Sequence, residues 1–247
     1  MTPDFPAALA FLIVLGLSVG AVVGSFAATA AIRMSEGKDP LRGRSQCDHC
    51  HRQLSWLETL PLIGFVLSHG RCQTCHAPID RFHMVGEFLG AFVLTICLDV
   101  QPDILGALTG FLCLCLLTAA LIDLKTMRLP DVLTALVAAC ALAIGAMTNT
   151  WQYGLVAAVA AFIILFALKW YLERRHQRGM LGLGDVKLVA ALALWLGART
   201  PAILAFAAIM ALGFVVLRRR KGAVPFGPFI AVASFVLGVL VPEGWFL

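Results

Sequence analysis

The sequence predicts an all-α polytopic membrane protein with about eight transmembrane helices, and three observations support this fold class. Of its 247 residues, 60% are hydrophobic and 13% are charged, and the mean hydropathy is +0.90. This is more apolar than a soluble domain requires. Apolar blocks of about 17 to 25 residues, the length of a membrane-crossing helix, recur along the chain. Basic residues gather between alternate blocks, as in short cytoplasmic loops.

The apolar blocks define the predicted spans. They cover residues 7–32, 84–100, 103–122, 130–147, 151–171, 184–198, 201–217 and 225–242. We expect the first block to be a retained span and not a cleavable signal, because MTPDFP lacks a basic region and Arg33 follows the apolar block.

The distribution of Lys and Arg predicts the orientation of these spans. With the N-terminus external, the cytoplasmic segments are 33–83, 123–130, 172–184 and 218–224. Of the 19 Lys and Arg residues, all except Arg199 lie in these segments or at their flanks. We therefore expect both termini to be external and the large loop, residues 33–83, to be cytoplasmic. The net charge of +5 reflects this orientation and gives no argument for nucleic-acid binding.

Four cysteines in the large loop form a metal-binding pattern. The motifs CDHC and CQTC supply two C-x2-C pairs separated by 21 residues, which is close to the spacing of a tetrahedral zinc site. The predicted ligands are Cys47, Cys50, Cys72 and Cys75. A cytoplasmic loop is in a reducing compartment, which disfavours disulfides, and the spacing favours a metal over free or redox-active thiols.

Four sulfur ligands leave no open coordination position, so the predicted Zn²⁺ is structural and not catalytic. Three histidines lie close enough in sequence to compete as ligands, namely His49, His51 and His76. We expect them to be ordinary loop residues, because four sulfurs already complete the site.

Two aspartates lie at matching depths in separate spans. Asp185 follows Gly182 and Gly184 and is seven residues beyond Arg178, which is about 10 Å along a helix. Its place early in the next helix favours a carboxylate through the helix dipole. Asp123, in IDLKTMRLPD, lies about 7 Å inside the interface that Arg128 marks.

An aspartate at the end of a span can also be a helix cap or an interfacial charge. The shared depth and side of Asp123 and Asp185 favour a catalytic pair. Two carboxylates in a low dielectric cannot both ionise cheaply, so one holds a proton while the other activates water, as in aspartic proteases. The pair titrates as a unit, so the sequence does not assign the base.

In combination, the motifs resemble those of the prepilin leader peptidases, bacterial inner-membrane enzymes of the G-x-G-D aspartic type. The matching segments, in chain order, are Gly24-Ser25-Phe26, RSQCDHCHRQLSW (44–56), LPL (60–62), GRCQTC (70–75), IDLKTMRLPD (122–131), GLGDVKLVAALALWLG (182–197) and PFGPF (225–229).

The resemblance implies an N-terminal region, 1–100, and a six-span G-x-G-D aspartic peptidase domain, 101–247. It also implies that Asp123 and Asp185 are catalytic and that the loop cysteines form the zinc-type site. The implied substrates are type IV pilin-like or pseudopilin precursors, whose short basic leader is removed on the cytoplasmic side just ahead of an apolar helix. Acids in the large loop that are candidates for holding this leader are Glu36, Asp39, Asp48, Glu58 and Asp80.

Many members of this family also methylate the new N-terminus with S-adenosylmethionine. The chain departs from the family pattern at Ala28 and Thr59, where asparagine is usual, and at FHMVGE (82–87), where an aromatic residue and proline are usual. These departures leave the aspartates untouched but put the methyl transfer in doubt.

Two other classes of protein remain open at this stage. An ion- or proton-coupled transporter can carry paired intramembrane acids, although we detect no internal repeat of the kind typical of transporters. A non-catalytic pilus or secretion assembly protein with a zinc loop is the other alternative.

Overall fold

The computed structural model describes residues 5–176, 181–219 and 224–241, and these residues form helices and loops without a β-strand. The helices are α1 (Phe5–Ser35), α2 (Ile63–Leu67), α3 (Arg81–Val100), α4 (Ile104–Thr126), α5 (Asp131–Met147), α6 (Trp151–His176), α7 (Leu183–Leu196), α8 (Thr200–Arg218) and α9 (Gly227–Phe235). A 3₁₀ turn, Gly197–Arg199, joins α7 to α8, and a π-helical turn, Val236–Leu240, extends α9. The predicted all-α fold class is confirmed.

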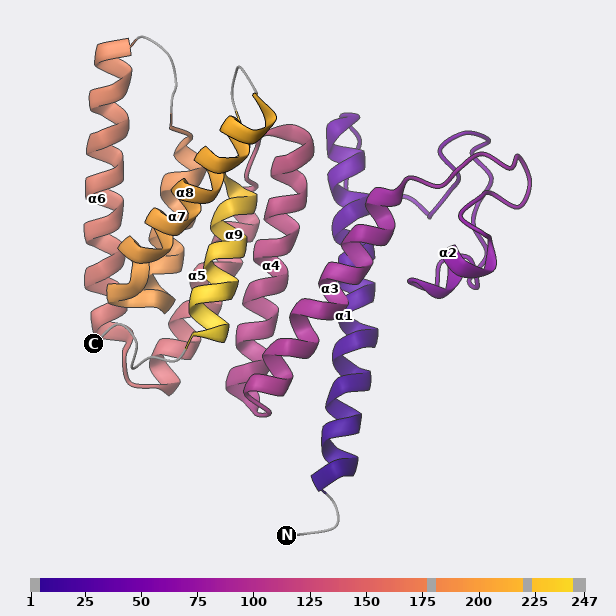
Figure 1. Ribbon diagram of the computed structural model, residues 1–247, viewed down its shortest axis with the longest axis horizontal. Helices are drawn as coiled ribbons and strands as arrows, with labels where there is room; N and C mark the ends of the chain where they lie inside the picture. Colours follow the sequence, from indigo (N-terminus) through magenta and orange to yellow (C-terminus); the bar gives the residue numbers. More distant parts are fainter. Residues whose placement is uncertain (1–4, 177–180, 220–223, 242–247) are drawn as a thin grey trace.

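Each predicted apolar block corresponds to one long helix of the described chain, whereas the short helix α2 was not predicted. Five segments are long and apolar enough to cross a membrane: Ala7–Ser35, Arg81–Val100, Ile104–Thr126, Trp151–Arg175 and Leu183–Arg218. The last of these contains both α7 and α8, which run in opposite directions in Figure 1. The remaining apolar helices, Asp131–Met147 and Gly227–Leu240, are shorter.

The helices form two groups that lie side by side (Figure 1). Helices α1 and α3 pack against each other on one side, and α4 to α9 form a bundle on the other. The C-terminal ends of α1, α4, α6 and α8 all lie at the upper end of Figure 1, together with the start of α7. The basic residues Arg33, Lys125 and Arg218 are in the last turns of three of these helices. That this end faces the cytoplasm remains a prediction from charge.

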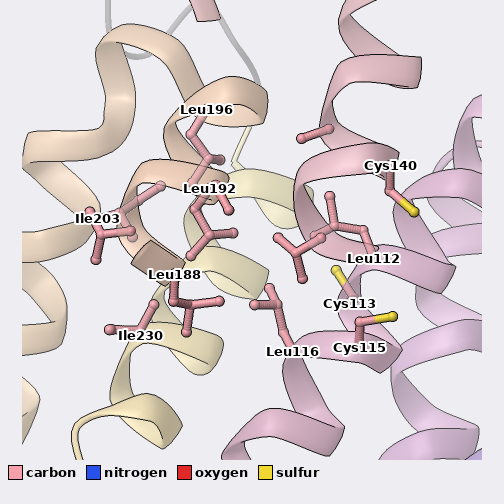
Figure 2. Close-up of a cluster of buried hydrophobic side chains, with 14 of the residues drawn as sticks. Leu112, Cys113, Cys115, Leu116, Cys140, Leu188, Leu192, Leu196, Ile203 and Ile230 are labelled. Atoms are coloured by element: carbon pink, nitrogen blue, oxygen red, sulfur yellow. The ribbon is translucent and has the colours of Figure 1, made fainter. Parts of the chain in front are cut away.

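Leucines at helical spacing on α4 and α7 belong to one apolar core, which also includes residues of α5 and α9. Leu112 and Leu116 of α4 and Leu188 and Leu192 of α7 are at most 2% exposed, and Ile230 of α9 packs with them (Figure 2). Residues four apart lie on one face of a helix, so each helix presents one continuous apolar row to this core. This core fixes the rotation of α4 and α7 about their own axes.

Glycines allow α1 and α3 to approach closely. Gly16, Gly20 and Gly24 recur every four residues on one face of α1. A Cβ at Gly20 would overlap the backbone carbonyl of Gly90, and a Cβ at Gly24 would overlap that of Gly86. Small residues at such a spacing permit backbone-to-backbone packing in membranes, where no hydrophobic effect drives helices together.

We expect Gly20→Ala to destabilise the α1–α3 pair by about 1–3 kcal/mol, because the added methyl group overpacks this contact. Thermal unfolding of the protein in bilayer discs measures the change. Gly213→Ala in α8 is the matched control, since open space surrounds the position of its Cβ. An equal loss of stability in both variants would contradict the close α1–α3 contact.

Candidate active site and metal centre

Asp123 and Asp185 extend from the helix faces that meet in the core. Asp123 lies two turns beyond Leu116 on the same face of α4, and Asp185 lies one turn before Leu188 on α7. Asp123 is 5% exposed and Asp185 is half-buried. The last turn of α4 and the first turn of α7 lie at the same end of the bundle (Figure 1), so the structure places both predicted acids at that end, beyond the leucine core.

The start of α9 contributes a partner for Asp123 that the sequence did not reveal. The backbone N–H of Gly227 donates to Asp123 Oδ2 at 2.9 Å. A Cβ at Gly227 would lie 2.9 Å from the same oxygen, so glycine is what permits this approach. The motif PFGPF (225–229) marks the start of this helix, and the first N–H groups of a helix have no partner within the helix and are free to bind an acid. The motif does not indicate which acid is bound.

The glycines before Asp185 allow close packing around its carboxylate. A Cβ at Gly182 would lie 2.9 Å from Asp185 Oδ2, and a Cβ at Gly184 would lie 3.1 Å from the Cβ of Leu129. Leu129 belongs to the connection that follows α4, so the two aspartate-bearing segments also touch here.

Two ion pairs hold the helices that carry the acids. Lys187 Nζ lies 2.8 Å from Asp131 Oδ1, which ties α7 to the first turn of α5. Lys125 Nζ lies 3.7 Å from Asp80 Oδ2 and 4.4 Å from the ring centroid of Phe82, which ties the end of α4 to the start of α3. Each lysine therefore links two helices.

The four loop cysteines form a compact cluster that can hold a metal ion. Their Sγ atoms all lie within 4.8 Å of one another. Cys47 Sγ is 3.7 Å from Cys75 Sγ, and Cys50 Sγ is 3.9 Å from Cys72 Sγ. Four sulfurs bound at about 2.3 Å to one tetrahedral ion lie about 3.8 Å apart, so the donor set fits such an ion.

The two C-x2-C pairs have the same local fold. In the first, the Cys47 N–H donates to Arg52 O and the His51 N–H donates to Cys47 O, both at 2.9 Å. Cys72, Ala77 and His76 repeat this pattern in the second pair with the same distances. His51 and His76 both have a φ of 55°, so they serve as the left-handed turn residue of each pair. The cluster of four sulfurs contains neither histidine.

Backbone N–H groups favour the thiolate form of one cysteine in this cluster, and an ion pair lies beside the cluster. The N–H groups of Cys75 and Thr74 lower the pKa of Cys72 to about 6, which favours the thiolate that binds metals. Arg52 binds both oxygens of Glu58, at 2.6 and 3.2 Å, and this contact lowers the pKa of Glu58 to about 2. The Arg52–Glu58 pair joins the first cysteine pair to the segment that follows it.

Glu87 anchors the large loop to the membrane helices. Ser25 Oγ of α1 donates to Glu87 Oε1, and the N–H of Leu62 donates to Glu87 Oε2, both at 2.7 Å. A cavity of about 180 Å³ lies beside this junction between α1, α3 and the loop. Glu87 thus lines the loop cavity, and its two oxygens join α1 and the loop to α3.

Most acids considered for holding a basic leader already have basic partners. The pairs are Glu36 with Lys38 (2.6 Å), Asp39 with Arg42 (3.6 Å), Glu58 with Arg52 (2.6 Å) and Asp80 with Lys125 (3.7 Å). Asp48 lines the loop cavity. Glu36 and Glu58 line the same cavity as Asp48, so the structure gathers three of these acids there, two of them already paired with a basic residue.

Together, the membrane helices, the paired acids and the four-cysteine loop define a polytopic membrane protein with a metal-binding loop and a candidate hydrolytic site. Comparison with known proteins identifies the class further. Residues 18–100 match the model of the bacterial peptidase A24 N-terminal domain, and residues 110–217 match that of the type IV leader peptidase family. No solved structure matches the chain.

Characterised relatives match most of the chain. A prepilin leader peptidase/N-methyltransferase of Aeromonas hydrophila is 32% identical over 78% of this chain and 70% of its own length. One from Burkholderia pseudomallei (strain K96243) is 30% identical over 92% of this chain and 83% of its own length. The type 4 prepilin-like proteins leader peptide-processing enzyme of Escherichia coli O78:H11 is 30% identical, covering 77% and 73%. The chain belongs to the type IV leader peptidase family, and it is a peptidase.

We expect Cys47→Ser and Cys72→Ser each to lower the bound metal from about one ion per chain to a small fraction of that, because three sulfurs leave the tetrahedral site incomplete. Elemental analysis of protein purified under reducing conditions measures this. Cys140→Ser, in the buried core of α5, is the control. Metal-free wild-type protein would contradict the assignment of these cysteines as a metal site.

Proposed function

We propose that the chain is an aspartic endopeptidase that removes the short basic leader of type IV pilin-like precursors at the cytoplasmic face of the bacterial inner membrane. The observation that carries this proposal is that α4 and α7 each place one acid at the same end of a shared apolar core. Membership of a peptidase family favours this activity over the transporter and the non-catalytic assembly protein.

In the proposed mechanism, Asp123 and Asp185 share one proton. The ionised carboxylate takes a proton from a bound water, which attacks the carbonyl carbon of the scissile peptide bond. The protonated carboxyl first donates a hydrogen bond to the carbonyl oxygen. It then donates its proton to the leaving nitrogen as the C–N bond breaks. The Gly227 N–H, bound to Asp123 Oδ2 at 2.9 Å, holds one oxygen of the pair in place.

The position of the acids suits this class of substrate. Both lie near the helix ends at which the basic residues gather, in the last turn of α4 and the first turn of α7. A precursor with a basic leader and an apolar helix keeps its leader outside the membrane, and the bond between the two parts then reaches the depth of the acids.

We propose that the metal at the cysteine cluster is Zn²⁺ and that its role is structural. The ligands Cys47, Cys50, Cys72 and Cys75 fill all four tetrahedral positions, so none is left for water or substrate. When bound, the ion would join the two C-x2-C segments of the large loop. We further propose that residues 1–100, which hold this site, and residues 101–247, which hold the aspartates, form two functional regions.

The cavity beside the large loop gives no support to a site for S-adenosylmethionine. The cavity of about 180 Å³ between α1, α3 and the large loop is below the range of about 300–1,000 Å³ usual for ligand pockets. Ala28 is fully buried, and Thr59 Oγ1 donates within the loop to Trp56 O at 2.8 Å. The proposal therefore rests on the peptidase reaction and includes no methyl transfer.

We expect Asp123→Asn and Asp185→Asn each to lower the cleavage rate by at least about 10²–10⁴-fold, because each removes one half of the acid–base pair. The assay mixes purified protein in bilayer discs with a pilin-like precursor and measures leader removal by gel and mass spectrometry. Asp103→Asn is the matched control, because Asp103 caps α4 at its opposite end and asparagine caps equally well.

Full cleavage by both aspartate variants would rule out the pair as the catalytic site. A transported ion or solute whose movement depends on the two acids, in a wild-type protein that cleaves no precursor, would instead favour the transporter.

We expect Gly227→Ala to lower kcat by about 10- to 100-fold with little change in KM, because the added methyl group displaces the Asp123 carboxylate. Initial cleavage rates over a range of precursor concentrations separate the two constants. Gly213→Ala should leave both unchanged, since its Cβ meets open space. An unaltered kcat in Gly227→Ala would show that the contact with Asp123 does not matter for the reaction.

A further inference from the structure

The large loop contains a segment without exposed charge. Between Arg52 and Arg71, the only Asp, Glu, Lys or Arg is Glu58, whose side chain is 8% exposed and paired with Arg52. The rest of the loop on either side is rich in charged residues. Residues 53–70 thus differ sharply in character from the polar loop that contains them, and their one helix, α2, has five residues, too few to cross a bilayer.

This segment exposes large apolar side chains on α2 and the turn before it. Trp56 is 72% exposed, and Val66 and Leu67 are 69% and 60% exposed. Leu57 and Ile63 are also exposed, and we call these five side chains the apolar edge. A cluster of exposed apolar residues on a soluble loop marks an interaction surface.

Two hydrogen bonds fix the depth of the apolar edge. Leu62, directly before α2, donates to Glu87, which accepts from Ser25 of α1. A hydrocarbon core of about 30 Å corresponds to about 20 helical residues. Any 20-residue stretch of Ala7–Ser35 contains Ser25, so the level of Leu62 along α1 lies within the hydrocarbon or at its boundary.

The position of Glu87 along α3 gives a second, independent estimate of the depth of Leu62. Asp80 pairs with Lys125 at the end of α4, and Glu87 lies seven residues further along the chain, which is about 10 Å along a helix. Leu62 therefore lies deeper than Asp123, which is only two residues before Lys125. Figure 1 shows α2 beside α1 and α3, well below the upper ends of α1 and α4.

Several backbone N–H groups of residues 53–70 are hydrogen-bonded within the protein, which a low-polarity environment requires. The N–H groups of Gly64, Ser68 and Gly70 donate to carbonyls of the same segment at 2.8–3.0 Å, and the N–H of Leu62 is bound by Glu87. An unbonded backbone N–H or C=O group costs several kcal/mol in lipid, so these bonds lower the cost of placing the segment against the bilayer.

From these observations we infer that the apolar edge is inserted in the lipid leaflet beside α1 and α3, so that residues 53–70 anchor the large loop to the bilayer. Trp56 has the amphipathic ring that is enriched at membrane interfaces. The partner is the bilayer itself, because the edge lies at the level at which α1 is surrounded by lipid. The four-cysteine cluster is thereby held against the membrane surface.

Photocrosslinking of the full chain in phosphatidylethanolamine–phosphatidylglycerol discs tests this. p-Benzoylphenylalanine replaces Val66 in one variant and Leu41 in the control. Leu41 is also exposed, at 76%, but Arg42 O accepts from Arg33 at 2.9 Å, which places it about 12 Å higher along α1 than Ser25. Irradiation should give at least about fivefold more phospholipid adduct at position 66 than at position 41.

Equal lipid adducts at the two positions, or none at position 66, would overturn the inference. An adduct at position 66 with a second copy or another protein, without lipid, would do the same and would identify a protein interface instead. As a second measurement, the fluorescence of Trp56 is obtained by subtracting the emission of Trp56→Phe from that of the wild type. Lipids with brominated chains should quench this Trp56 fluorescence. Absence of this quenching would place Trp56 outside the leaflet.

Discussion

The apolar core that α4 and α7 share with α5 and α9 determines where the chemistry of this protein is located. Leu112 and Leu116 of α4 lie in this core with Leu188 and Leu192 of α7 and Ile230 of α9 (Figure 2). Because a helix is rigid over two turns, this core also fixes which way residues 123 and 185 point. A rotation of either helix would move its aspartate away from the other and expose it to lipid, where an ionised carboxylate is costly.

Three separate polar contacts link elements around this core. Lys187 binds Asp131, Lys125 binds Asp80, and Glu87 joins α1 to the large loop. Each contact links two elements far apart in the sequence. Polar groups at this depth need partners, and in this protein the partners also hold the helices in register.

Much of this arrangement could be predicted from the sequence. The eight apolar blocks and the spacing of the cysteines depend on local patterns, and both correspond to features of the structure. Asp123 and Asp185 were matched by their distances from Arg128 and Arg178, because the rise of a helix converts residue numbers into depth. The sequence contained no signal for the rotation of the helices, which depends on which side chains interlock.

The parts that could not be predicted depend on tertiary contacts. No local pattern shows that Gly227 donates to Asp123, that Lys187 selects Asp131, or that Glu87 draws Leu62 down along α1. The helix α2 was missed because five residues are too few to give a periodic pattern. Its apolar residues were visible in the sequence, but only the hydrogen bonds to Glu87 give their depth.

The central claim is that residues 123 and 185 are neighbours in the folded protein, and cross-linking in native membranes tests it most directly. The double variant Asp123→Cys/Asp185→Cys is treated with the shortest bifunctional methanethiosulfonate reagent, and linked peptides are identified by mass spectrometry. The double variant Asp103→Cys/Asp185→Cys, with one thiol at the opposite end of α4, is the control. We predict a link between positions 123 and 185 and none between 103 and 185. Absence of the first link, or equal yields in the two variants, would contradict the account.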